Sequence, residues 1–134
     1  MTSSNRIKAI IYKIIKGSAL EAEIVSNGGC LYRNSRPTNS NKEDIVISVL
    51  ATRNSQFQMA IVNVNVYVPD IRRDNDYIED EARTSLLQEK AIDLFKGIVH
   101  NDYKVELETQ EIFKVRDISE HCINNRLVVT IINI

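Results

Sequence analysis

The hydrophobic pattern at the start of the chain predicts an amphipathic helix. Isoleucines stand at positions 7, 10, 11, 14 and 15, which makes one apolar stripe at helical spacing. Ser3 or Ser4 can cap this helix, and Gly17 can end it. The opposite face carries basic side chains, those of Arg6, Lys8, Lys13 and Lys16. We interpret that face as a solvated cationic surface, with phosphate binding as the alternative.

Two strands are predicted in the middle of the chain. Residues 45–50 form a β-branched run, and residues 58–68 alternate strictly, with valines on one face and Asn63, Asn65 and Tyr67 on the other. Residues 52–55 read as the hairpin connection between them, and Pro69 can end the second strand. The sheet is therefore expected to be at least partly antiparallel.

The segment between the first helix and these strands gives a weaker pattern. The pattern over residues 19–25 is short and ambiguous, and Asn27, Gly28 and Gly29 then supply turn chemistry. Residues 34–42 are polar and lack periodicity, which is typical of a surface loop. We expect an extended arm or a hairpin over residues 26–43, and a contact between this loop and a partner.

The second half of the chain predicts a long helix followed by two strands. Asp74 offers an N-cap, and apolar residues then repeat at helical spacing as far as Ile98, which indicates a helix of about 20–24 residues. Residues 105–115 alternate as a half-exposed strand. Residues 127–134 are apolar on both faces, so that strand should be interior or covered by a neighbouring subunit.

These elements predict an α+β fold in a single domain that spans residues 1–134. We expect a mostly antiparallel sheet of about four to five strands with two helices on one face. The expected order is α-β-β-(β)-α-β-β, with two or three strands before the long helix.

Composition limits the function classes. The 134 residues carry a formal net charge of -1, which argues against a protein that holds nucleic acid by bulk phosphate neutralisation. Only Cys30 and Cys122 are present, too few for a disulfide framework, so both are expected to be free thiols. The chain begins without the basic-then-apolar order of a secretion signal and lacks a long apolar span, so we expect neither export nor membrane insertion.

Three groups of residues could carry chemistry, and we weigh each against a plainer role. His121 and Cys122 are adjacent, but neighbours on a strand point to opposite faces. Asp70 with Asp102 and Lys104 resembles the carboxylate set of metal-dependent nucleases, although a predicted helix separates the two aspartates. The acidic run Asp74, Asp76, Glu79, Asp80 and Glu81 lacks the ligand order of a calcium loop. We therefore expect no catalytic residue, no metal and no cofactor.

Two stretches give a resemblance to a known group of proteins. Residues 36–47, RPTNSNKEDIVI, and residues 62–70, VNVNVYVPD, resemble proteins in tailed phages and prophages of gut Bacteroidota. Those proteins are placed in the tail-completion and head-to-tail joining group. The element order also resembles the tail terminator fold, in which two helices cover one face of a sheet.

The resemblance implies a structural virion protein that forms a homo-oligomeric ring in the tail or neck, assembled in the host bacterial cytoplasm. The ring would be six-fold in a terminator or twelve-fold in a neck ring, with portal, neck or tail-tube proteins as neighbours. Double-stranded DNA would pass through the lumen without sequence-specific binding. A ring needs two different patches on each subunit. Our candidates, from the loop and the final strand, are Arg36, Pro37, Asn39, Glu43, Asp44, Val129, Ile131 and Ile132.

Two alternative functions remain at this stage. The first is a small metal-dependent nuclease that uses Asp70 and Asp102. The second is an adaptor that binds DNA through the cationic face of the first helix, and it predicts salt-sensitive affinity that depends on Lys8, Lys13 and Lys16.

Overall fold

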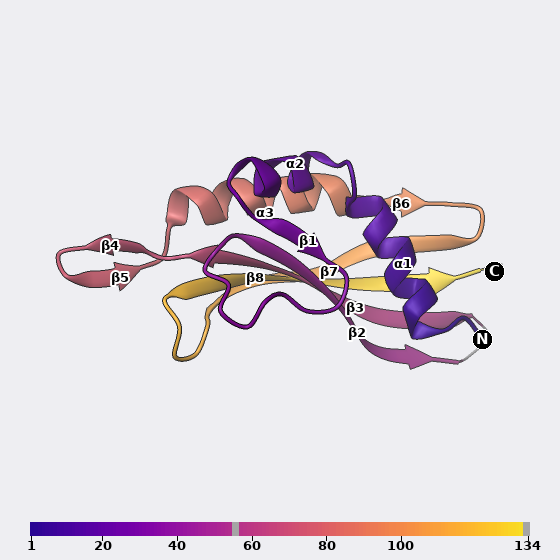
Figure 1. The fold of residues 1–134 in the computed structure, drawn as a ribbon. Helices are drawn as coiled ribbons and strands as arrows, with labels where there is room; N and C mark the ends of the chain where they lie inside the picture. The colour runs from indigo at the N-terminus through magenta and orange to yellow at the C-terminus, as the bar shows by residue number, and fades with distance from the viewer. Residues whose placement is uncertain (55–56, 133–134) are drawn as a thin grey trace.

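The computed structural model describes residues 1–54 and 57–132, and it has an α+β fold. Helices cover one side of a strongly curled sheet, and a small two-stranded hairpin projects from one end of the molecule (Figure 1). The N-terminus and the C-terminus lie at the opposite end from this hairpin (Figure 1). None of the described helices is both long and apolar enough to span a membrane.

Three helices begin at side chains that cap them. They are α1 (Ser4–Ile15), α2 (Ala19–Ser26) and α3 (Glu81–Phe95). In each, the side-chain oxygen of the preceding residue accepts a hydrogen bond from a backbone N–H of the first turn, and these capping residues are Ser3, Ser18 and Asp80. Gly17 has a φ of +80°, a left-handed conformation that ends α1 and turns the chain into α2.

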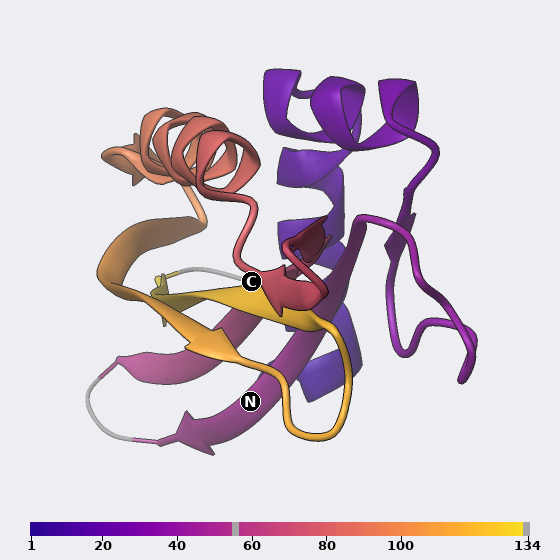
Figure 2. The ribbon, with the colours of Figure 1, turned by 90° about the vertical axis from the view of Figure 1, so that its left-hand side faces the viewer.

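Six strands form the main sheet in the order β1-β2-β3-β8-β7-β6. Their bounds are β1 (Cys30–Tyr32), β2 (Asp44–Arg53), β3 (Gln58–Pro69), β6 (Ile98–Val99), β7 (Tyr103–Lys114) and β8 (Glu120–Ile131). Only β1 and β2 pair in parallel, and the other pairs are antiparallel. Irregularities in β2 near Val49 and in β7 near Leu107 interrupt the register, which fits the strong curl seen in Figure 2.

The core lies between the helices and one face of the sheet. Alternate residues of β3 from Ala60 to Val68 are buried, and they meet the isoleucine stripe of α1 and the buried side chains of α2 and α3 in one cluster. The sheet's central strand pair, β3 and β8, carries most of this face. Burial of this many branched apolar side chains is the main stabilising contribution to the fold.

Several sequence predictions are confirmed. α1 begins and ends where the isoleucine stripe and its caps predicted. The alternating segment is β3, and β2 and β3 pair antiparallel. The final apolar run lies in β8, an interior strand between β3 and β7. The predicted hairpin connection includes Ser55, and the predicted end of the final strand includes residues 133–134, which lie outside the described residues.

Other predictions are wrong in ways that have physical reasons. The main sheet has six strands rather than four or five. The described chain has three helices rather than two, because the ambiguous residues 19–25 belong to α2. β1 pairs in parallel with β2, so residues 26–43 do not form a hairpin. The long second helix is shorter than expected: α3 begins at Glu81, while Asp74 lies in a turn between β4 (Ile71–Arg73) and β5 (Asp76–Ile78).

Candidate functional site

Arg36 holds the polar loop of residues 33–43 against the sheet. Its guanidinium forms an ion pair with Glu120, lies 3.8 Å from the Asp44 carboxylate and stacks 3.7 Å from the centroid of the Tyr67 ring. The Arg36 side chain is only 14% exposed, and the two carboxylates are 1% exposed. An ion-pair network within the subunit therefore holds the loop in place, and the charge of Arg36 is already paired inside its own chain.

Glu43 is similarly occupied. Arg83 on α3 donates hydrogen bonds of 2.7 and 2.8 Å to the Glu43 carboxylate and one of 2.9 Å to Glu23 on α2. The hydrogen bonds to Glu43 contribute most, and together with the one to Glu23 they raise the pKa of Arg83 above its ordinary value, although burial opposes this shift. This network joins the start of β2 to α2 and α3.

The predicted contact residues divide into two groups. Pro37, Asn39 and Ile132 are exposed and remain candidates for contact with a partner. The others are held within the chain, by ion pairs or in the core, and they are Arg36, Glu43, Asp44, Val129 and Ile131. The final strand is apolar on both faces, and its own subunit buries the face that carries Val129 and Ile131. On the other face Val128 is half-buried and Ile132 is exposed. The predicted patch is corrected to that extent.

The hairpin of β4 and β5 (residues 71–78) projects beyond the main sheet (Figure 1). We call this hairpin the arm; it is a different segment from the arm predicted over residues 26–43. Residues 71–77 are all exposed, including the large apolar side chains of Ile71 and Tyr77. Asp74 and Asn75 turn the arm with φ values of 52° and 67°, the left-handed conformation that these residue types tolerate best. An isolated two-stranded hairpin has no core of its own, so its apolar side chains are available to another molecule.

The root of the arm is fixed by Asp70. Its carboxylate accepts a 2.9 Å hydrogen bond from the Lys114 amine and lies 2.6 Å from Nδ1 of His121. The side chain of Asp70 is fully buried. Burial disfavours its charge, but the hydrogen bonds from Lys114 and His121 outweigh burial and hold the pKa of Asp70 below its ordinary value. Asp70 is therefore a structural anchor, because each of its carboxylate oxygens is engaged by a neighbouring side chain.

Exposed apolar side chains also gather at the end of the molecule opposite the arm. Thr2 is joined to Gln58 by two hydrogen bonds of 2.7 and 2.8 Å, which places the N-terminus beside the start of β3. Gln58 pairs with Ile131, the last residue of β8. The exposed side chains around this point are those of Met1, Phe57, Met59 and Ile132, and we call this set the apolar end. Such a group of neighbouring apolar side chains is typical of an interaction surface.

The nuclease constellation is not assembled. Asp70 lies at the end of the sheet where Pro69 pairs with Glu120. Asp102 lies at the other end, where its carbonyl accepts a hydrogen bond from Ile132 N. The two ends are joined by β8, and at about 3.3 Å per residue this strand separates them by roughly 35–40 Å. Two aspartates at this distance cannot share a metal ion.

His121 and Cys122 point to opposite faces of β8, as their adjacency predicted. His121 is bound to Asp70, whereas Cys122 is buried on the other face beside Tyr67 and Phe113. Burial, with a smaller contribution from Glu120, raises the pKa of the Cys122 thiol to about 12. A thiol in this environment is not an activated nucleophile.

The acidic run at residues 74–81 is dispersed over three structural roles. Asp74 and Asp76 belong to the arm, and Glu79 accepts a 2.6 Å hydrogen bond from Thr84. Asp80 caps α3, and Glu81 lies in the first turn of that helix. Among residues 1–54 and 57–132, there is no group of three acidic, histidine or cysteine side chains placed to hold a metal ion. The run is therefore a set of local structural groups.

The arm and the apolar end are the surfaces that the sequence predictions missed. The sequence predicts a helix cap at Asp74, although the pair Asp74 and Asn75 is also a turn signal. The apolar end had no local signal, because Met1, Phe57 and Ile132 come together only when distant strands pair.

Comparisons with known proteins give a likeness at the level of the fold. A chain in a solved structure described as "Virion of native gene transfer agent (GTA) particle" is similar to this protein with a TM-score of 0.57 and 11% identity. The similarity covers 92% of each chain. No family model matches the sequence, and no curated protein matches it.

Proposed function

We propose that this protein is a structural subunit of a virion, and that it forms a homo-oligomeric ring at the head-to-tail joint or tail terminus of a tailed phage. The observation that carries the proposal is the likeness of fold to a chain of a gene transfer agent virion over 92% of both chains. The resemblance of residues 36–47 and 62–70 to head-to-tail joining proteins supports the same role.

Two surfaces of the subunit support a role in assembly. The arm projects at one end of the molecule, and the apolar end lies at the other (Figure 1). A subunit that offers different contacts at its two ends can join unlike neighbours above and below it. We propose portal, neck or tail-tube proteins as these neighbours.

The proposed role requires no catalysis. Asp70 is committed to Lys114 and His121, and Cys122 is a buried thiol. We propose that double-stranded DNA passes through the lumen of the ring without sequence-specific binding, and the net charge of -1 suits a wall that does not retain DNA.

Native mass spectrometry of the purified protein tests this proposal, alone and after mixing with the portal and tail components of the same particle. A closed six-fold or twelve-fold species, alone or on a component, is the expected result. Negative-stain images of the same sample should show rings with a central channel. A chain that stays monomeric alone and binds none of the components would contradict the proposal.

Particle composition gives an independent test. Purified virions should contain the protein at a constant copy number that matches the ring, and particles made without its gene should accumulate as separate heads and tails. Complete, infectious particles that lack the protein would count against a joining role.

A further inference from the structure

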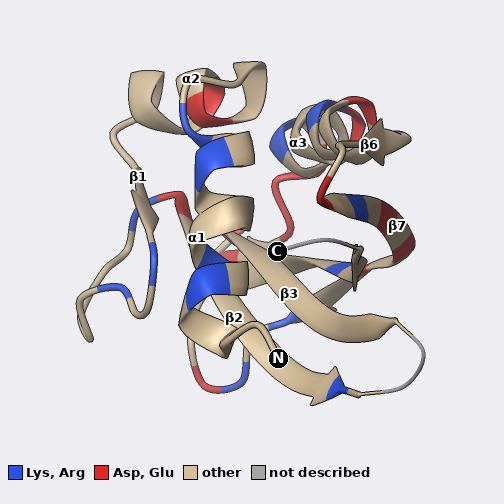
Figure 3. Ribbon diagram, turned by 90° about the vertical axis from the view of Figure 1, so that its right-hand side faces the viewer, with Lys and Arg blue, Asp and Glu red and all other residues tan. Residues whose placement is uncertain are grey.

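Two oppositely charged surfaces lie over opposite edges of the main sheet. α1 packs on β2 near the β1 edge, and α3 packs on β7 near the other edge. Figure 3 shows basic residues on α1 and on the loop after β1, whereas α3 and β7, on the other side of the molecule, carry acidic residues with basic residues between them.

The basic surface has no acidic residue in its own segment. Residues 1–20 carry Arg6, Lys8, Lys13 and Lys16 and no Asp or Glu. Within the described chain, Lys8 donates only to the neutral Asn34, and Lys16 pairs with Glu21 at 3.1 Å. Arg6 and Lys13 are exposed and have no ion-pair partner among the described residues. Their charges are therefore available to another molecule.

The acidic surface is the counterpart. Its exposed carboxylates lie on α3 and β7 and outnumber the exposed cations there, Lys96, Lys104 and Lys114. The carboxylates are Glu81, Glu89, Asp93, Glu106, Glu108 and Glu111. Glu106 pairs with Lys104, and Glu108 lies 3.8 Å from Arg126, both at exposed positions. The other four have no ion-pair partner in the described parts of the chain.

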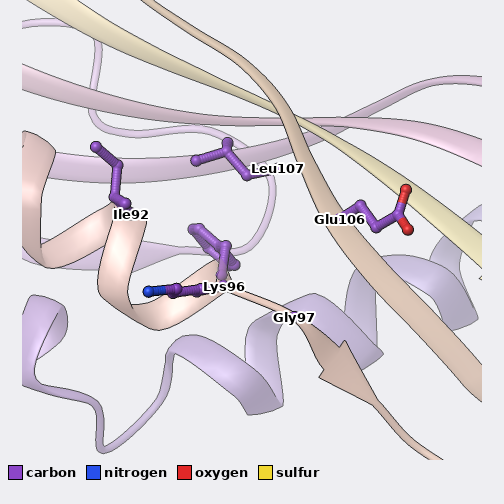
Figure 4. A pocket seen from close by; sticks show the side chains of 6 residues that line it. Ile92, Lys96, Gly97, Glu106 and Leu107 are labelled. Carbon is purple, nitrogen blue, oxygen red and sulfur yellow. The ribbon is translucent and has the colours of Figure 1, made fainter.

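A pocket opens within the acidic surface. It has a volume of about 430 Å³ and is lined by Ile92, Phe95, Lys96, Gly97, Glu106 and Leu107. Ile92 of α3 and Leu107 of β7 lie beside one another at this hollow (Figure 4). An apolar centre with a charged rim is the usual anatomy of a protein–protein interface.

We infer that the acidic surface on α3 and β7 binds the cationic face of α1 of a second copy of this chain. The inference rests on the proposed ring and identifies its lateral interface, which is heterologous because the two surfaces differ. Charge complementarity is the reason to name a second copy as the partner: both signs occur on one chain, over opposite sheet edges. DNA is the alternative partner for α1, and the charge-reversal experiment separates the two.

Charge reversal tests the inference. Arg6→Glu with Lys13→Glu reverses the basic surface, and Glu89→Lys with Asp93→Lys reverses the acidic one. All four positions are exposed on helices, and a glutamate at position 6 adds a capping box with Ser3, so α1 should remain folded. Each double variant should lower the fraction of assembled protein at least about tenfold at fixed concentration, because like charges then face each other.

An equimolar mixture of the two variants is the decisive sample. The reversed basic surface of one then meets the reversed acidic surface of the other, so alternating rings should form again in the mixture. A chain with all four substitutions should also assemble. The matched control for the reversed basic surface is Arg53→Glu with Arg116→Glu. It makes the same change of net charge as the Arg6 and Lys13 variant, at exposed positions outside both surfaces, and should assemble like the wild type.

The outcomes separate this inference from the proposed function. If each double variant forms rings as well as the wild type does, the inference alone is overturned. The same holds if the mixture stays monomeric while circular dichroism shows that both chains are folded. Loss of DNA binding by the Arg6 and Lys13 variant without loss of rings would assign α1 to DNA instead. A wild-type chain that remains monomeric at low ionic strength and on its proposed neighbours would overturn both.

Discussion

The guanidinium of Arg36 lies over the ring of Tyr67, with 3.7 Å between the guanidinium carbon and the ring centroid. The same guanidinium pairs with Glu120, which stands 84 residues further along the chain. These contacts fasten a polar loop to the face of the sheet that the helices leave uncovered. The loop is thus part of the folded subunit. The contacts of Arg36 hold it in place, while Pro37 and Asn39 remain exposed at its tip.

Arg36→Ala should lower the free energy of unfolding by about 3 kcal/mol, because it leaves two buried carboxylates without their cation. Arg33→Ala is the matched control on the same loop. Arg33 is exposed and donates to the Asn5 carbonyl, so its loss should cost no more than about 0.5 kcal/mol. Urea denaturation measures both. Equal effects from the two substitutions would contradict the clamp.

The pKa of Asp70 predicts a dependence of stability on pH. Because this pKa is held below its ordinary value of 3.8, the carboxylate stabilises the fold above that pH, and the contribution is lost as pH falls through the folded pKa. Asp70→Asn should therefore be less stable than the wild type at neutral pH, and the gap should shrink below about pH 3.8. Urea midpoints across this range give the answer. A gap that does not change with pH would refute the role of the ionised carboxylate.

The two cysteines should differ in reactivity. Cys30 is exposed, whereas Cys122 is buried with its pKa raised to about 12, so little thiolate is present at neutral pH. The native protein should take up one maleimide per chain, and the denatured protein two. Intact-mass measurement with peptide mapping should place the single label on Cys30. Fast labelling of Cys122 in the native state would show that β8 opens at this point.

Removal of the arm should separate folding from assembly. Replacement of residues 71–78 by a short glycine–serine linker keeps Asp70, His121 and Lys114 and removes only the projecting hairpin. Because residues 71–77 are exposed, the free energy of unfolding should change by less than about 1 kcal/mol, while binding to the neighbouring virion protein is lost. The double substitution Ile71→Ser with Tyr77→Ser should weaken the same binding. A large loss of stability on removal would instead make the arm part of the fold.

The elements that the sequence predicted are those whose signal is local and repeated. The isoleucine stripe of α1 and the alternation of β3 each place many apolar side chains on one face, and packing then follows the pattern. α2 was missed because an eight-residue helix offers only two turns of pattern. Asp74 misled the prediction because aspartate suits both a helix cap and a tight turn, and here the turn competed successfully.

The contact residues were harder to predict, because burial of a charge depends on partners that are distant in sequence. In the sequence Glu43 resembles part of a surface loop, but in the fold its carboxylate accepts a hydrogen bond from Arg83 on α3. Gly29 shows the same dependence on distant residues: a Cβ there would overlap the backbone carbonyl of Glu43, so the residue is fixed by the approach of β2. The exposed surfaces follow only from the full set of strand pairings.

The most direct test of the account is the mass of the assembled protein. Native mass spectrometry, of the wild type alone and together with portal and tail components, should show a closed species of six or twelve copies whose abundance falls as salt screens the charged surfaces. A monomer in every one of these samples, at low and at high salt, would contradict the proposal that this chain is a ring-forming subunit of a virion.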